Sequence, residues 1–126
     1  MVDVRCVIVD DNAAFLVTAQ ALLDREGLTV VGVASSQAEA LKRVDELRPD
    51  VVLIDIDLGP ESGFAVAREL LAVVRPSPPR LILVSAHPQD DFAELVEQSP
   101  AIGFIAKTEL SGARIVAMLD GRQTSD

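Results

Sequence analysis

Residues 51–57 read Val51-Val52-Leu53-Ile54-Asp55-Ile56-Asp57, an apolar run that leads into two aspartates. A short, continuous apolar run rich in β-branched residues is typical of a strand that is buried on both faces, as strands in parallel sheets are. Runs of the same kind occur at residues 4–9, 29–34, 80–85 and 102–106. The sequence therefore predicts five buried strands, of which residues 51–56 form the third.

Amphipathic segments separate these strands and predict helices. The clearest has apolar residues at positions 15, 16, 19, 22 and 23, and Gly27 is suited to end it. The next begins at a capping box, Ser36-Gln37-Ala38-Glu39, and ends before Pro49. Further helices are expected at about residues 63–74, 89–98 and 109–120. Strand–helix units in series predict an α/β fold with a doubly wound, five-stranded parallel sheet.

Composition and charge exclude several classes of protein. The chain has 126 residues, which suit one domain, and its single cysteine, Cys6, excludes a disulfide scaffold. No apolar stretch is long enough for a membrane span and no signal peptide is visible, so we expect a cytoplasmic protein. The net charge of −9 disfavours direct binding to nucleic acid. We expect residues 1–121 to form the domain and residues 122–126 a polar tail.

Polar side chains follow four of the predicted strands. Ligands of a doubly wound sheet bind outside the carboxyl ends of its strands, so side chains there should converge. Clustered carboxylates repel one another, and a hard divalent cation such as Mg²⁺ relieves that repulsion. A metal, an ammonium group and a hydroxyl together suit the neutralisation of a transferring phosphoryl group. The residues concerned are Asp10, Asp11, Asp55, Asp57, Ser85 and Lys107.

Four motifs resemble those of the receiver domains of two-component response regulators, the CheY-like family. They are Val9-Asp10-Asp11, residues 48–58 leading to Gly63, Leu83-Val84-Ser85-Ala86, and Gly103-Phe104-Ile105-Ala106-Lys107. The resemblance covers residues 4 to about 121. It implies a flavodoxin/CheY-like (βα)5 fold with strand order 2-1-3-4-5. The sequence departs from the family pattern at Thr108, where many members have proline, and at Phe104, where tyrosine is common.

The resemblance also implies a role for each motif residue. Asp55 is the expected phosphoacceptor, and Ser85 and Lys107 are expected to contact the phosphoryl group. Asp10, Asp11 and Asp55, with the backbone carbonyl of Asp57, are the expected ligands of Mg²⁺, for which Mn²⁺ is the alternative. Ser85 and Phe104 are the expected switch residues, which turn inward when the phosphoryl group is present.

The partners implied by the resemblance are a histidine kinase or a histidine phosphotransfer protein as the donor, and a downstream protein or a fused effector as the target. The fourth helix, fifth strand and fifth helix form the expected output face, through which a homodimer could form. Such a protein accepts a phosphoryl group and is not a multiple-turnover enzyme. For His87, we weigh an ordinary loop residue against a residue that controls water access to the aspartyl phosphate.

Two other functions fit parts of the sequence. A small phosphatase of the haloacid dehalogenase type also uses an Asp-x-Asp pair, which Asp55 and Asp57 match, although such enzymes place the pair on their first strand. A receiver that is no longer phosphorylated, and serves as a scaffold, is the second; intact Asp55, Ser85 and Lys107 argue against it. Taken singly, Asp10 suits a helix N-cap and Phe15 suits the core.

Overall fold

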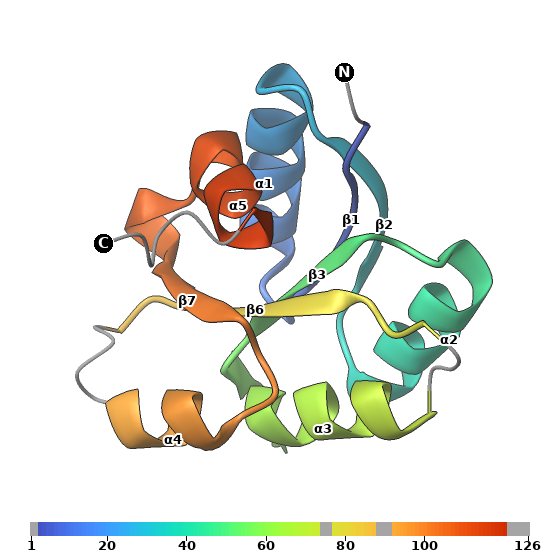
Figure 1. Ribbon diagram of the computed structural model, residues 1–126, viewed down its shortest axis with the longest axis vertical. Helices are drawn as coiled ribbons and strands as arrows, with labels where there is room; N and C mark the ends of the chain where they lie inside the picture. Colours follow the sequence, from blue (N-terminus) through green and yellow to red (C-terminus); the bar gives the residue numbers. More distant parts are fainter. Residues whose placement is uncertain (1–2, 74–76, 88–91, 121–126) are drawn as a thin grey trace.

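A computed structural model describes residues 3–73, 77–87 and 92–120, which form a five-stranded parallel sheet with helices on both faces (Figure 1). Along the sheet the strands follow the order β2-β1-β3-β6-β7. This is the predicted order 2-1-3-4-5, because β4 and β5 belong to a separate small hairpin and the fourth and fifth strands of the sheet are therefore labelled β6 and β7. The strands are β1 (Arg5–Val9), β2 (Thr29–Ala34), β3 (Val51–Asp55), β6 (Arg80–Ser85) and β7 (Gly103–Ala106). The predicted α/β fold is confirmed, with β1, β3 and β7 one residue shorter than expected.

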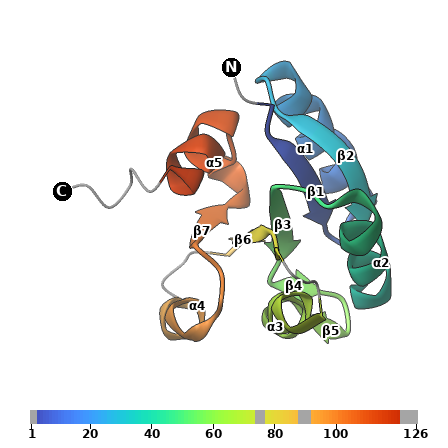
Figure 2. The same cartoon turned by 45° about the vertical axis from the view of Figure 1, so that its right-hand side comes forward.

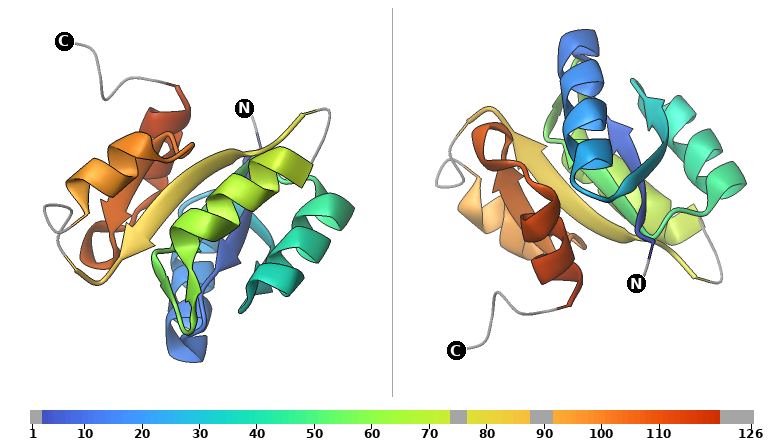
Figure 3. Two further views of the ribbon diagram at one scale, coloured as in Figure 1. Left: turned by 90° about the horizontal axis from the view of Figure 1, so that it is seen from below. Right: turned by 90° about the horizontal axis from the view of Figure 1, so that it is seen from above.

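Two layers of helices cover the sheet. Helices α1 (Ala13–Arg25) and α5 (Gly112–Leu119) lie on one face, and α2 (Gln37–Leu47), α3 (Gly63–Val73) and α4 (Ala93–Gln98) lie on the other (Figures 2 and 3). Successive strand residues point to opposite faces, so each strand contributes to two separate cores. Ile8 and Leu53 lie in the core beneath α1 and α5, whereas Val7 and Val52 lie in the other. None of the helices described is long and apolar enough to cross a membrane.

Strand β3 occupies the middle of the sheet. It pairs in parallel with β1 on one side and with β6 on the other, and all five of its residues are buried. Burial on both faces is what its continuous apolar run predicts. Its last residue is Asp55, so this central, fully buried strand places a carboxylate at the carboxyl end of the sheet.

The helix ends agree in part with the sequence signals. Ser36 caps α2 by accepting a hydrogen bond from the backbone N–H of Glu39, as predicted. In a capping box the Glu39 carboxylate would also accept a hydrogen bond from the backbone N–H of Ser36. It instead accepts from the backbone N–H and the hydroxyl of Ser35, so this part of the prediction is wrong by one residue. Helix α2 ends at Leu47, and Arg48 (φ 49°) turns the chain into Pro49.

The last two helices are shorter than predicted. Helix α5 begins at Gly112, where Ser111 caps it, and not at Glu109, because Lys107–Glu109 form a separate 3₁₀ turn, η2. Helix α4 begins at Ala93, after Phe92; its expected start at residues 89–91 lies outside the described residues. So do the expected end of α3 at residue 74 and the predicted tail.

A hairpin that the sequence did not indicate follows β3. It consists of β4 (Asp57–Leu58) and β5 (Glu61–Ser62), and Gly59 adopts φ 62° in its turn. The backbone N–H of Gly63 then donates to the carbonyl of Ile56 at 2.8 Å. A Cβ atom at Gly63 would overlap the carbonyl oxygen of Asp55. Glycine at this position therefore lets α3 begin directly against the end of β3.

Candidate functional site

The carboxyl ends of β1 and β3 bring three acidic side chains together. Asp10, Asp11 and Asp55 each offer a carboxylate oxygen, and these atoms lie within 4.8 Å of one another. Asp10 is fully buried and Asp55 is 5% exposed, whereas Asp11 faces solvent. The parallel pairing of β1 with β3 places both strand ends at the same edge of the sheet, and this pairing creates the cluster.

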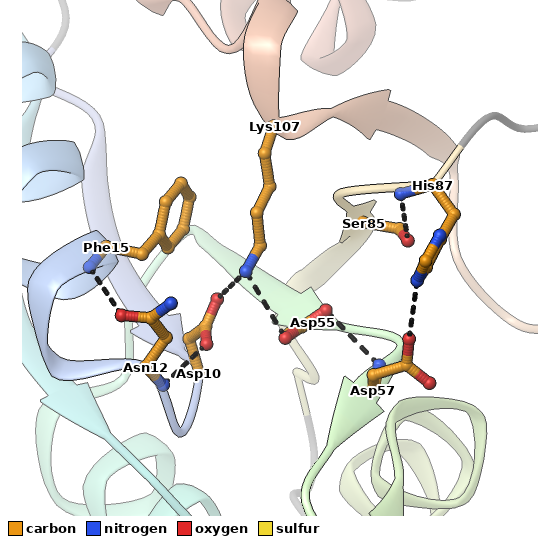
Figure 4. A network of polar contacts seen from close by, with 8 residues as sticks. All are labelled: Asp10, Asn12, Phe15, Asp55, Asp57, Ser85, His87 and Lys107. Carbon is orange, nitrogen blue, oxygen red and sulfur yellow. Dashed lines mark hydrogen bonds and ion pairs between the residues drawn. The ribbon is translucent and has the colours of Figure 1, made fainter.

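Lys107 reaches this cluster from the turn after β7 (Figure 4). Its Nζ atom lies 2.7 Å from Oδ2 of Asp10 and 3.4 Å from Oδ2 of Asp55. The Lys107 side chain is 15% exposed, so the ammonium group is largely withdrawn from water. One cation therefore serves as counter-ion to two buried carboxylates.

The cluster carries excess negative charge, because three carboxylates face a single ammonium group. Burial raises the pKa of Asp55 to about 6, and the charge of Asp10 adds to the rise, which Lys107 and the backbone N–H of Asp57 oppose. Burial lowers the pKa of Lys107, but its hydrogen bonds and charge contacts with Asp10 and Asp55 outweigh burial and leave that pKa raised. Oxygen ligands with unneutralised charge suit a hard divalent cation, so these residues could hold a metal.

Ser85 and His87 border the site at the end of β6. Ser85 is fully buried, and its Oγ accepts a hydrogen bond from the backbone N–H of His87 at 2.9 Å. The His87 ring lies at the rim, where Nε2 is 3.7 Å from Oδ2 of Asp57 (Figure 4). Both of these side chains are more than half exposed. The Asp57 side chain thus points to the rim, while its backbone N–H donates to Oδ1 of Asp55.

Phe104 lies on β7, on the side of the sheet covered by α2, α3 and α4. Its side chain is buried and belongs to the core of that layer. A cavity of about 410 Å³ lies beside it, with His87 on one wall and Arg114 of α5 on another. The cavity connects the rim of the site to α5, which belongs to the expected output face.

The structure brings Asp10, Asp11, Asp55 and Lys107 together. It adds two residues to which the sequence analysis assigned no role in the site. Asn12, and not Asp10, is the N-cap of α1: its side chain accepts from the N–H of Phe15, and its own N–H donates to Oδ1 of Asp10. The Phe15 ring lies beneath Lys107, with Nζ 4.3 Å from the ring centroid. The pattern Asp-Asn before a helix was a usable signal for the cap, but nothing in the sequence pointed to the contact with Lys107.

Comparisons with known proteins agree on one family. The sequence model of the response regulator receiver domain matches residues 6–120. A protein-glutamate methylesterase/protein-glutamine glutaminase of Symbiobacterium thermophilum is 36% identical over 108 residues, which make up 82% of this chain and 29% of the relative. The chain therefore spans less than a third of the length of that relative.

Two solved structures are also similar. The NarL signal receiver domain of Mycobacterium tuberculosis has a TM-score of 0.80 and 29% identity, with 98% of each chain covered. A response regulator protein of Burkholderia pseudomallei, solved with a phosphorylated aspartic acid, a calcium ion and citrate, has a TM-score of 0.77 and 26% identity over 93% of this chain and 66% of the other. With its fold, its acidic cluster and the sequence match over residues 6–120, the chain belongs to the response regulator receiver domain family.

Proposed function

We propose that this receiver is a phosphorylation switch in which Asp55 accepts a phosphoryl group from a histidine kinase or a histidine phosphotransfer protein. The observation that carries the proposal is the placement of Asp55, buried at the sheet edge beside Asp10, Asp11 and Lys107. In the transfer, a carboxylate oxygen of Asp55 forms the new O–P bond. The P–N bond to the donor histidine breaks, and its electron pair leaves with the imidazole.

The carboxylates of Asp10, Asp11 and Asp55 are the residues that would hold Mg²⁺, together with the backbone carbonyl of Asp57. Mn²⁺ accepts the same kind of oxygen ligands. When bound, the ion neutralises charge on the phosphoryl oxygens. The calcium ion and phosphorylated aspartic acid of the similar Burkholderia protein support a divalent cation in a domain of this kind.

Lys107 and Ser85 would contact the phosphoryl group from the other side. The Lys107 ammonium is already 3.4 Å from Oδ2 of Asp55, so a small movement away from Asp10 brings it to a phosphoryl oxygen. The Ser85 oxygen accepts the His87 N–H, which leaves the hydroxyl proton available for donation. Movement of Ser85 toward the phosphoryl group would be transmitted to Phe104 on the neighbouring strand, and so to the output face.

The output face would comprise α4, β7 and α5. We infer that it contacts a downstream protein or a fused effector domain, or a second copy of the chain in a homodimer. The Symbiobacterium relative is a longer protein that is named as an enzyme, and this chain matches 29% of its length. Residues 6–120 of this chain match the receiver domain model. We therefore infer that residues 1–121 act as a cytoplasmic switch without multiple turnover of their own.

The phosphatase alternative has less support in the site. Its mechanism requires the second aspartate of Asp-x-Asp as an acid or base beside the first. The Asp57 side chain is instead 65% exposed and lies next to His87. The family match also favours a receiver.

The test is the intact mass of the protein after incubation with Mg²⁺ and acetyl phosphate. We expect one added phosphoryl group on the wild type and none on Asp55→Asn. Asp57→Asn is the matched control, because it removes an exposed carboxylate two residues away, and we expect it to gain the group. Equal labelling of Asp55→Asn and wild type would overturn the assignment of the acceptor. No labelling of wild type, even with a histidine kinase as donor, would favour the scaffold alternative.

A further inference from the structure

Phe15, near the start of α1, lies against Lys107, which follows β7 near the other end of the chain. The Lys107 Nζ is 4.3 Å from the centre of the Phe15 ring (Figure 4), which is within the range of a cation–π contact. The Phe15 side chain is half-buried and packs on the core beneath α1 and α5. Its backbone N–H is bound by the Asn12 side chain, which fixes the first turn of the helix and hence the position of the ring.

The three partners of the Lys107 ammonium differ in one respect. Two of them, Asp10 at 2.7 Å and Asp55 at 3.4 Å, are carboxylates that a divalent cation would also bind. A bound cation would neutralise them and repel the ammonium group. The face of the Phe15 ring is the partner that a hard cation does not take, because such ions bind oxygen ligands.

We propose that Phe15 is a positioning residue, which keeps the Lys107 ammonium beside Asp55 after a divalent cation has taken the carboxylates. The proposal rests on the proposed role of Asp55 as phosphoacceptor. Phe15 acts through Lys107 and touches neither the cation nor the phosphoryl group. Its contribution is therefore greatest in the metal-loaded site, where Lys107 has lost its strongest partner.

The first test is a series of fluorinated phenylalanines at position 15, with one, two and three ring fluorines. Fluorine withdraws electron density from the ring face and nearly preserves its size, so packing is kept while the attraction for the ammonium group falls. We measure the rate constant of phosphorylation by acetyl phosphate at saturating Mg²⁺. We expect a stepwise decrease, reaching about two- to fivefold with three fluorines. A rate constant that is the same across the series would overturn the proposal.

The second test does not depend on phosphorylation. A side chain over an aromatic face has proton resonances shifted upfield, so NMR of the ε-methylene protons of Lys107 reports the contact. We expect the upfield shift to persist in the wild type at saturating Mg²⁺ and to be lost in Phe15→Leu. Loss of the shift in wild type when Mg²⁺ is added would overturn the proposal.

Val17→Ala is the matched control for substitution on α1, because this side chain is 70% exposed on the same helix. We expect it to change neither the rate constant nor the Lys107 resonances. If wild type accepts no phosphoryl group at all, the proposed function fails, while the resonances of Lys107 still decide whether the Phe15 contact survives Mg²⁺. The two failures are therefore distinguishable.

Discussion

The Nζ atom of Lys107 lies closer to Asp10, at 2.7 Å, than any other ion-paired atoms described in the structure lie to each other. Asp10 is fully buried, so its charge depends on this lysine for compensation. Removal of one partner from a buried ion pair leaves the other charge uncompensated, which is strongly destabilising. A divalent cation in the same cluster would supply the missing positive charge.

We therefore expect Lys107→Met to lower the free energy of unfolding by about 2–3 kcal/mol in EDTA, and by clearly less at millimolar Mg²⁺. Urea unfolding in the two buffers measures both values. Lys42→Met, which removes an exposed lysine on α2, should cost less than about 0.5 kcal/mol in either buffer. An equal loss for Lys107→Met with and without Mg²⁺ would contradict this explanation.

The raised pKa of Asp55 makes stability depend on pH. The folded chain, with a pKa of about 6 at Asp55, binds this proton more tightly than the unfolded chain, whose pKa is near 3.8. Stability at this site therefore increases as the pH falls from about 6 towards 3.8, and is lowest above pH 6. In EDTA, Asp55→Asn should be more stable than wild type at pH 7.5 by about 1–2 kcal/mol. This value is lower than the full pKa difference would give, because solvent partly screens the charges at the open site.

Urea unfolding of Asp55→Asn and wild type from pH 4 to pH 8 tests this dependence. The advantage of the variant should shrink as the pH falls through 6 and be small at pH 4. A gain that is constant with pH would mean that the charge of Asp55 is not its cause.

Two glycines separate the effects of a backbone clash and a side-chain clash. A Cβ atom at Gly63 would overlap the backbone of Asp55 and Ile56, whereas at Gly103 it would meet the flexible Met118 side chain, 2.8 Å from Sδ. Gly63→Ala should therefore cost about 3 kcal/mol or more and weaken Mg²⁺ binding, and Gly103→Ala should cost about 1 kcal/mol. Thermal unfolding and a Mg²⁺ titration measure the two effects. Equal losses of stability in the two variants would show that the backbone at the start of α3 shifts as easily as the Met118 side chain.

His87 tests whether the rim of the site limits access of water. Its ring lies 3.7 Å from Asp57 and close to Phe92, at a centroid separation of 6.3 Å. If the ring shields the aspartyl phosphate, His87→Ala should lose the phosphoryl group about two- to fivefold faster, a small change in the barrier to hydrolysis. The loss is followed by intact mass after the donor is removed. An unchanged rate would assign His87 the role of an ordinary loop residue.

The sequence predicted the sheet because the strands carry strong signals. The apolar runs at 29–34 and 80–85 match β2 and β6 residue for residue. The rule that functional side chains follow the carboxyl ends of parallel strands then placed Asp10, Asp55 and Lys107 at one edge, where the structure has them.

The features that the sequence did not predict are very short elements and contacts between residues far apart in the chain. The strands of the hairpin after β3 have two residues each, too few for any periodicity to be visible. The residues of the 3₁₀ turn at Lys107–Glu109 are also compatible with an α-helix, so the sequence did not separate this turn from α5. Ser111, which caps α5, was the available signal for the true start of the helix. The contact of Phe15 with Lys107 depends on how α1 and β7 pack across the sheet, which no local pattern encodes.

The division of the interior by the sheet has a consequence for how such a domain can change in evolution. Adjacent residues of β7, Phe104 and Ile105, belong to different cores, one beneath α2, α3 and α4 and the other beneath α1 and α5. Substitutions can therefore accumulate in one compartment while the packing of the other is conserved. The layer of α1 and α5 and the layer of α2, α3 and α4 can therefore be repacked independently, because the strands between them are all that the two cores share.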